Sequence, residues 1–220
     1  MNKIHQIYSI LYKSFGKQGW WPTTLEDELH PKHHGKAPKN DKERFEIIIG
    51  AILTQNTNWK NVEKAIFNLN KNQLLEINKI KKINKKRLAS LIKPSGYFNQ
   101  KAERLKLIAD FYSKNKNPTR EELLNVKGIG PETADSILLY ALGKPSFVVD
   151  AYSKRIFSRL GLCDGKCSYD RLQELFHKSL PKKTKLFNEY HALLVELGKN
   201  HCKTKPICKE CPLKKLCSYS

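Results

Sequence analysis

The spacing of hydrophobic residues along the chain predicts a protein built from helices. Apolar residues recur every three or four positions, as on one face of an α-helix, and no stretch shows the alternation of a half-buried strand. Two short helices are also expected between residues 73 and 92. The longer helices are predicted at residues 3–15, 43–53, 59–69, 99–113, 151–160, 168–179 and 184–199. The pattern therefore predicts an all-α fold without an internal repeat.

One stretch in the second half of the chain predicts two short helices joined by a tight turn. Thr119 can cap the first of them, because Glu122 stands three residues later, as a capping box requires. Gly128 and Gly130 then interrupt the apolar pattern, and glycine allows a positive φ and a close approach of another backbone. Pro131 suits the first turn of the second helix, where its missing N–H would have had no partner.

Such a turn can bind a phosphate group. The N–H groups after Gly128 and Gly130 would point outward at a helix N-terminus, where the helix dipole also favours an anion. A contact of this kind reads no base, so it would be indifferent to nucleotide sequence. The alternative is an ordinary connection between two helices with glycine at the bend.

The composition favours a polyanionic partner. Lys and Arg number 41 against 21 Asp and Glu, which gives a formal net charge of +20, and nucleic acid is the usual partner of so basic a chain. Hydrophobic residues make up 40% of the chain, enough for a core. We expect no membrane span, because no run of about 18 apolar residues occurs. The first residues lack the apolar centre of a secretory signal, so we expect an intracellular, cytoplasmic protein.

Four of the six cysteines lie close together near the C-terminus. They form the pattern C-x5-C-x2-C-x5-C at Cys202, Cys208, Cys211 and Cys217. Four thiolates at this spacing can surround one metal centre, either a tetrahedral zinc ion or a 4Fe–4S cluster. The other two, Cys163 and Cys167, are expected to be free thiols.

The stretch with the two glycines carries a specific resemblance. Residues 126–134, Val-Lys-Gly-Ile-Gly-Pro-Glu-Thr-Ala, are similar to the helix-hairpin-helix of the endonuclease III superfamily of DNA glycosylases. Gly143, Pro145 and Asp150 follow in the order of that family's Gly/Pro-rich stretch and aspartate. The similarity extends from about Phe45 to the last cysteine. It implies an all-helical DNA repair enzyme with two helical domains and the active-site cleft between them.

The same resemblance implies a domain plan, a cofactor and a partner. Residues 40–145 would form a helical barrel domain containing the hairpin, and residues 1–39 with 146–220 a second helical domain ending in an iron–sulfur loop. The family carries a 4Fe–4S cluster at nearly this cysteine spacing, with a first gap usually one residue longer, and zinc is the alternative. The expected partner is double-stranded DNA containing damaged bases, bound by a monomer that does not associate with membranes.

The resemblance also assigns residues to the steps of base excision. Asp150 matches the carboxylate that stabilises the sugar cation, although as a bare residue it could simply cap the helix at 151. Gln55 matches the glutamine that enters the gap left by the flipped nucleotide, and Tyr97 lies in a stretch similar to a second DNA-inserting loop. The expected DNA contacts of the hairpin are at Lys127, Gly128, Ile129, Gly130 and Thr133.

Glu132 departs from the bifunctional members of the family, which carry a lysine here whose amine attacks the sugar. A carboxylate cannot form a Schiff base, so the sequence is similar to the monofunctional branch, with Glu132 as a second catalytic candidate. Trp20 and Trp21 resemble a feature of endonuclease III-like 3-methyladenine DNA glycosylases and could bind a cationic alkylated base. Packing in a core is the alternative for this pair.

Three functions are consistent with these observations. The leading one is hydrolytic removal of alkylated bases by a monofunctional DNA glycosylase. The second is a bifunctional endonuclease III-type glycosylase with AP lyase activity on oxidised pyrimidines. The third is a DNA-binding protein without chemistry, and Asp150 and the tryptophan pair favour an enzyme over it.

Overall fold

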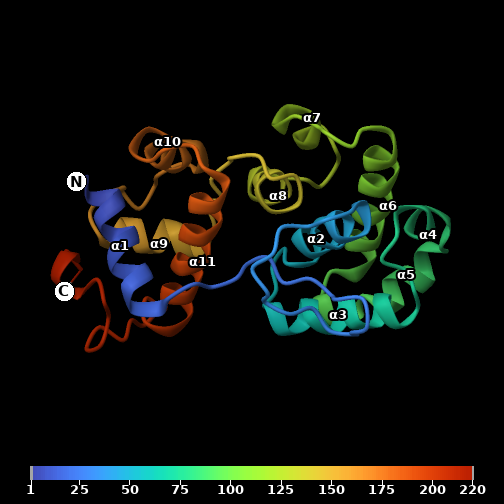
Figure 1. The fold of residues 1–220 in the computed structure, drawn as a ribbon, viewed down its shortest axis with the longest axis horizontal. Coiled ribbons are helices and arrows are strands. Elements are labelled where there is room, and N and C mark those ends of the chain that lie inside the picture. The colour runs from blue at the N-terminus through green and yellow to red at the C-terminus, as the bar shows by residue number, and fades with distance from the viewer. Residues whose placement is uncertain (1, 220) are drawn as a thin grey trace. The chain divides into compact units, whose positions relative to one another are not determined.

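The computed structural model describes residues 2–219, and every regular element within them is helical (Figure 1). The only pairing of extended backbone in this range is an isolated antiparallel bridge between Thr23 and Lys32. The all-α prediction is therefore confirmed. None of the helices in the described part of the chain is both long and apolar enough to cross a membrane.

The chain divides into two compact units. The hairpin unit comprises Trp21–Lys144, and the terminal unit combines the N-terminal segment up to Trp20 with the segment from Pro145 onward. The terminal unit is therefore discontinuous in sequence, and the hairpin unit is one uninterrupted stretch.

The hairpin unit is organised around α2 (Asp41–Leu53), which is buried over its last nine residues, from Phe45 to Leu53. A helix that is apolar on all sides has to be covered on all sides. Its neighbours are α3, α6, α8 and the π-helical turn. The other elements of the unit are α3 (Trp59–Lys71), α4 (Ile77–Lys82), α5 (Lys85–Leu91), a 3₁₀ turn (Lys93–Ser95), α6 (Phe98–Lys114), α7 (Arg120–Leu124), α8 (Pro131–Ser136) and a π-helical turn (Ile137–Ala141) that continues α8.

The boundary between the units differs from the predicted domain plan on the N-terminal side. Residues 21–39, assigned from the sequence to the second domain, belong to the hairpin unit. Buried Trp21 packs beneath Gly50 of α2, where an added Cβ would lie 3.1 Å from its ring. The backbone N–H and hydroxyl of Thr24 both donate to the carboxylate of Glu46, also on α2. These contacts attach the segment to α2.

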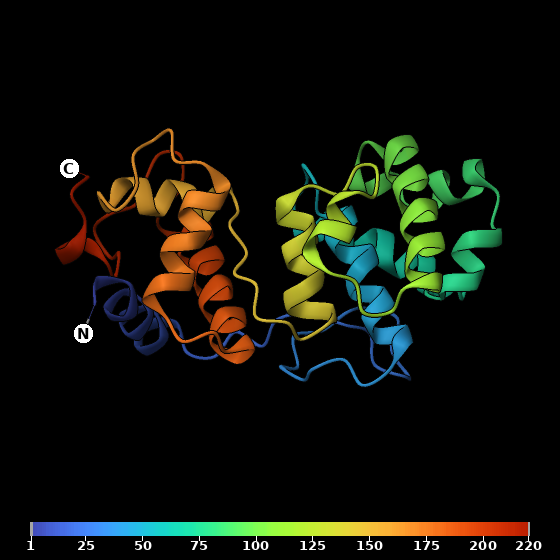
Figure 2. The same cartoon turned by 90° about the horizontal axis from the view of Figure 1, so that it is seen from above.

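Among the described residues, the longer helices of the terminal unit are α1, α9, α10 and α11, drawn as ribbons in Figure 2. α11 packs against both α1 and α9. The rings of Phe147, Phe176, Phe187 and Tyr190 meet in the core, with stacked and edge-on geometries. The elements are α1 (Lys3–Phe15), α9 (Ala151–Arg159), α10 (Tyr169–Ser179), α11 (Thr184–Asn200) and a 3₁₀ turn (Lys214–Leu216).

Side-chain caps mark the start of several of the helices. Asn58 caps α3, and Thr119 forms the predicted capping box with Glu122 at the start of α7. Asp150 caps α9 by accepting a hydrogen bond from the Ser153 N–H. Side chains that accept these N–H bonds satisfy donors that the first turn of a helix otherwise leaves without partners.

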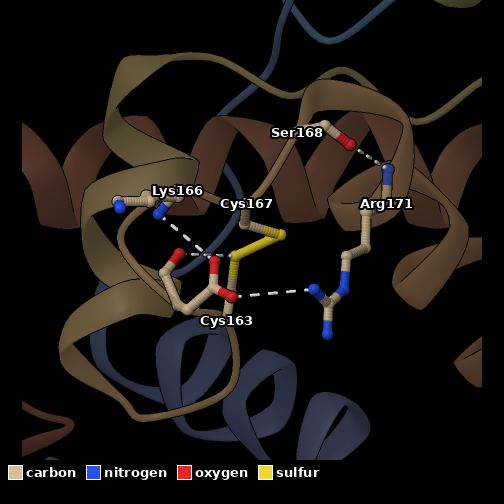
Figure 3. The surroundings of a disulfide bond; sticks show 6 residues. Cys163, Lys166, Cys167, Ser168 and Arg171 are labelled. Atoms are coloured by element: carbon tan, nitrogen blue, oxygen red, sulfur yellow. Dashed lines mark hydrogen bonds and ion pairs between the residues drawn. A yellow bond between two sulfur atoms is a disulfide. The ribbon is translucent and has the colours of Figure 1, made fainter.

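Cys163 and Cys167 form a disulfide bond in the loop between α9 and α10 (Figure 3). Their Cα atoms lie 5.8 Å apart, within the usual span of such a bond. The chain turns back between them, since the Cys167 N–H donates to the Asp164 carbonyl, and Asp164 also pairs with Arg171. The prediction that these two cysteines are free thiols is therefore wrong, because the turn brings both sulfur atoms together.

Candidate functional site

The hairpin between α7 and α8 has one glycine in a left-handed conformation. Gly128 has φ +86°, and a Cβ there would lie 2.5 Å from Arg104 Nε. Gly130 is extended at φ −93° and precedes Pro131, the first residue of α8. Of these two positions, only 128 needs glycine for its backbone conformation, because its φ is positive. The absence of a side chain there also makes room for the Arg104 side chain.

The N–H groups of the turn are arranged differently from the prediction. The Ile129 N–H donates to the Val126 carbonyl at 3.0 Å and so closes the turn. Pro131, which follows Gly130, has no N–H to offer. Neither of the two N–H groups expected after Gly128 and Gly130 is therefore available for a phosphate. The Ile129 side chain is only 5% exposed and anchors the turn in the core of the hairpin unit.

Gln55 is tied to the hairpin by hydrogen bonds. Its Nε2 donates to the Gly128 carbonyl at 3.1 Å and to the Thr133 hydroxyl at 2.9 Å. Its Oε1 accepts from Arg104 Nη1 of α6. The structure therefore brings together three of the predicted DNA-binding residues and adds Arg104, which nothing in the sequence had indicated.

A polar hollow of about 210 Å³ lies beside this network. It opens between the end of α2, α6 and the start of α8, so Glu132 shares it with Gln55. The side chains of Gln55 and Glu132, both predicted to be functional, therefore face the same hollow. Its lining residues are Ala51, Thr54, Gln55, Asn56, Arg104, Glu132, Thr133 and Ser136.

Tyr97 stands out from the surface of the hairpin unit. Its side chain is 63% exposed, and its backbone is left-handed at φ 45°, directly after Gly96 at φ +69°. A bulky residue with positive φ is an outlier that surrounding structure must hold in place. The turn therefore presents an aromatic ring to solvent from a constrained backbone.

Lys127 is 81% exposed and pairs with Glu103 of α6 at 2.9 Å. Glu103 also pairs with Lys85 of α5 at 2.9 Å. Hydrogen bonds from Lys127 and then Lys85 lower the pKa of Glu103 to about 2. Exposed pairs of this kind contribute little to stability, so Lys127 can exchange Glu103 for another anion at small cost.

Asp150 is placed in the terminal unit with two polar partners. Its Oδ1 accepts from the Ser153 N–H at 2.7 Å and from the Ser153 hydroxyl at 2.8 Å. Its Oδ2 lies 3.6 Å from His191 Nε2 of α11, and the two side chains are 12% and 6% exposed. Burial alone raises the pKa of Asp150, but His191 and Ser153 together outweigh it and bring the pKa below the ordinary value. Asp150 is thus a nearly buried carboxylate that stays charged.

The two tryptophans lie in different units and have different surroundings. Trp20 is half-buried and lies edge-on to His191, with ring centroids 6.0 Å apart and Lys199 Nζ 5.7 Å from its ring. Trp21 is 5% exposed and packs against Trp59 and Tyr140. Trp21 therefore belongs to the core of the hairpin unit, as the alternative interpretation held, whereas Trp20 is next to the partner of Asp150.

The four C-terminal cysteines line one hollow of about 290 Å³ in the terminal unit. All four are free thiols. Burial raises the pKa of Cys211, and the nearby thiols of Cys202, Cys208 and Cys217 raise it further. In residues 2–219 no three His, Cys, Asp or Glu side chains are already grouped as around a metal ion. The donor set itself, four sulfurs with no carboxylate in the lining, suits iron–sulfur or zinc chemistry.

Several residues at these sites were missed from the sequence. His191 is 41 positions from Asp150, and Arg104 is 49 from Gln55, so no local pattern connects either pair. Arg159 donates to the Cys202 sulfur and to the Lys203 and Thr204 carbonyls at the base of the cysteine loop. Ser153 could have been found, since a polar residue three positions after a helix cap commonly interacts with it.

Comparison with known proteins agrees with this geometry. Residues 49–182 match the family described as HhH-GPD superfamily base excision DNA repair protein. The chain is 45% identical to the "Putative DNA repair glycosylase MJ1434" of Methanocaldococcus jannaschii, over 97% of this chain and 95% of that protein. It is 33% identical to endonuclease III of Thermotoga maritima, over 88% of this chain and 92% of the relative.

A solved structure adds a further likeness. The crystal structure of H. pylori 3-methyladenine DNA glycosylase bound to 1,N6-ethenoadenine superposes with a TM-score of 0.70 at 30% identity, over 90% of this chain and 98% of that one. The chain therefore belongs to the HhH-GPD superfamily of base excision DNA repair proteins, as an endonuclease III-like DNA glycosylase.

Proposed function

We propose that this glycosylase is monofunctional and hydrolyses the N-glycosidic bond of alkylated bases in duplex DNA. One observation carries the proposal: the first turn of α8 presents Glu132, not an amine, to the hollow that it shares with Gln55. A carboxylate cannot form the Schiff base that strand cleavage requires. The 30% identity with the H. pylori 3-methyladenine glycosylase supports the choice of alkylated bases.

Asp150 is proposed as the catalytic carboxylate. Loss of the base leaves positive charge on the sugar, and a buried carboxylate stabilises that charge electrostatically. The glycosidic bond breaks first, and its electron pair leaves with the base. A water oxygen then bonds to the sugar carbon and releases its proton to the solvent. A purine alkylated at N3 or N7 is already cationic, so it leaves as a neutral base without a proton from the enzyme. The lowered pKa of Asp150 makes it a weak base, which suits charge stabilisation better than proton abstraction.

Access to the base requires the nucleotide to leave the duplex. We assign the gap that it leaves to Gln55 and to Tyr97, whose ring is exposed on a constrained turn. Phosphate contacts are assigned to the hairpin at Lys127, Gly128, Gly130 and Thr133, whereas Ile129 anchors the turn in the core. We assign stacking on the damaged base to Trp20, whose ring already has the ammonium of Lys199 5.7 Å away. Buried Trp21 supports the fold of the hairpin unit instead.

The C-terminal loop is proposed to hold a 4Fe–4S cluster. Cys202, Cys208, Cys211 and Cys217 would be its ligands, and zinc is the alternative for the same sulfurs. When bound, the cluster would cross-link a loop that also carries several lysines. Arg159 would hold the base of that loop through its contacts with the Lys203 and Thr204 carbonyls.

The test is base release from matched duplexes carrying one alkylated, oxidised or deaminated base. We expect free base from the alkylated duplex and an intact abasic site that breaks only after alkali or heat. Borohydride should trap little covalent complex, with a bifunctional glycosylase run in parallel as the positive control.

Two results would contradict the proposal. Efficient borohydride trapping, with strand cleavage at the rate of base release, would favour the bifunctional reading that the endonuclease III relatives support. Binding of every duplex without any base release would favour a DNA-binding protein without chemistry.

A further inference from the structure

Lys101 is a buried lysine that plays no part in the site described so far. It lies on the first turns of α6 and is 1% exposed. Its ammonium donates to the Leu53 carbonyl at 2.8 Å and to the Ser95 carbonyl at 2.7 Å. No carboxylate contributes to the shift of its pKa, so carbonyl dipoles take the place of a counter-ion.

Both carbonyls end a helical element just before a proposed DNA-inserting residue. Leu53 is the last residue of α2 and precedes Gln55 by two positions. Ser95 is the last residue of the 3₁₀ turn and precedes Tyr97 by two positions. The carbonyls in the last turn of a helix have no partner within it, and a cation there also interacts well with the helix dipole.

We propose that Lys101 is a positioning residue that holds the Gln55 turn and the Tyr97 turn at one fixed separation, so that the two enter the DNA as a unit. The inference rests on the proposed function, in which these two side chains fill the gap left by the flipped nucleotide. Lys101 itself touches neither DNA nor the reacting atoms.

The same face of α6 extends the arrangement by one turn. Arg104, three residues after Lys101, donates to Gln55 Oε1. Helix α6 therefore fixes both the backbone before Gln55, through Lys101, and the Gln55 side chain, through Arg104. A helix is stiff over one turn, so the spacing of these two side chains on α6 is transmitted directly to the turn that they hold.

The energetics favour a positional role over a purely stabilising one. Burial of an ammonium without a carboxylate is costly, and an apolar residue of similar volume often stabilises a core as well or better. Burial, with a smaller contribution from Arg104, accordingly lowers the pKa of Lys101 to about 8. A methionine at this position could not donate two directed hydrogen bonds to two separate segments of the chain.

The chain offers a matched control on the same helix. The Lys106 ammonium also donates to backbone carbonyls, those of Lys81 and Ile83 at 2.7 Å and of Ile80 at 3.2 Å. These carbonyls end α4, which carries no proposed DNA-inserting residue. Lys106→Met therefore removes the same kind of interaction without affecting the two turns.

The experiment compares wild type, Lys101→Met and Lys106→Met by urea unfolding and by their affinity for two duplexes, one undamaged and one with a stable abasic-site analogue. We expect both variants to shift the unfolding midpoint. Lys101→Met alone should lower the preference for the abasic duplex, by about tenfold if roughly 1.4 kcal/mol of positioning is lost. An equal loss of preference in both variants, or in neither, would overturn the proposal.

A second measurement avoids any dependence on how well Lys101→Met folds. Gln55→Ala, Tyr97→Ala and the double variant are compared, with Lys101 intact, for affinity to the abasic duplex. If the two turns act as a unit, the losses of binding free energy in the single variants should be strongly non-additive in the double variant. Additive losses would mean that the turns act independently and would contradict the proposal. If wild type shows no preference for the abasic duplex, the proposed insertion itself fails, which is a separate result from additivity.

Discussion

Two carboxylates that lie in protein interiors have opposite pKa shifts in this chain. Burial dominates at Glu46 and raises its pKa to about 7, even though Thr24 donates two hydrogen bonds to it. At Asp150 the contributions of His191 and Ser153 exceed the effect of burial, and the pKa is lowered. The difference lies in the partners: a histidine ring stands beside Asp150, whereas neutral groups alone donate to Glu46. Each shift leads to a prediction for a single substitution.

Asp150→Asn should reduce base release by about 10²-fold or more, because it keeps the shape of the carboxylate and removes its charge. Asparagine still caps a helix, so the start of α9 and the binding of abasic-site DNA should be preserved. Single-turnover release of an alkylated base measures the effect, with Asp170→Asn at an exposed position in the first turn of α10 as the control. Full activity in Asp150→Asn would mean that another carboxylate carries the reaction, with Glu132 the first candidate.

Glu46 should make the free energy of unfolding fall as the pH rises from about 4.5 to about 7. Its folded pKa of about 7 exceeds the ordinary 4.5, so the folded state binds the proton more tightly and the benefit is lost as pH rises through 7. The full effect is about 3 kcal/mol. Urea unfolding between pH 5 and pH 8 should show it, and Glu46→Gln should remove that pH dependence. The exposed Glu26→Gln should retain it, and identical pH profiles for wild type and Glu46→Gln would contradict the assignment.

At the scale of elements, the hairpin, α6 and the end of α2 form one connected structure. Gln55 donates to Gly128 and Thr133 of the hairpin and accepts from Arg104 of α6. The hairpin is therefore not an isolated turn but is braced by Gln55, which follows the end of α2 and which we propose enters the DNA. Movement of Gln55 into DNA would break its hydrogen bond to the Gly128 carbonyl and so alter the hairpin. The proposed insertion of Gln55 and the proposed phosphate contact of the hairpin would therefore be physically coupled.

The loop from Cys202 to Cys217 is the second element with a measurable consequence. We expect purified protein to be brown, with broad visible absorption near roughly 400 nm and iron in proportion to the chain. Cys208→Ser should lose the colour while the helices are retained, because the loop lies at the end of the terminal unit and contains only a short 3₁₀ turn. If anaerobically prepared protein contains one zinc and no iron per chain, the loop holds zinc, the alternative metal, and not the cluster.

At the scale of the whole molecule, the excess of 20 positive charges should dominate binding to undamaged DNA. Affinity should be nearly independent of sequence and fall steeply with salt, by about 0.9 in log–log slope for each phosphate contact. Titration of two unrelated duplexes from low to moderate salt measures it. Lys127→Ala should reduce the slope by roughly one contact, since Lys127 only has to exchange exposed Glu103 for a phosphate. Salt-independent binding would contradict a backbone-directed mode.

The sequence by itself determined the helices, their caps and the hairpin. The capping box of Thr119 with Glu122, the cap at Asn58 and the positive φ of Gly128 all depend on residues within one or two turns of each other, so a local pattern is enough to predict them. The cysteine pattern likewise brings four thiols into one loop. The caps and the glycine turn depend on neighbours within a few residues, and the four cysteines lie within one short segment of the chain.

Only the tertiary structure decided which side chains share a site. His191 reaches Asp150, Arg104 and Thr133 reach Gln55, and Lys101 reaches Leu53. These pairs are 41 to 78 positions apart in the sequence, and the packing that joins them is encoded by no local pattern. The adjacent residues Trp20 and Trp21 belong to different units, because the Trp20 indole packs beside His191 and the Trp21 indole packs under Gly50. Hydrophobic burial is non-directional and set by the whole core, so the spacing of apolar residues predicts which face is buried but not which partner it meets.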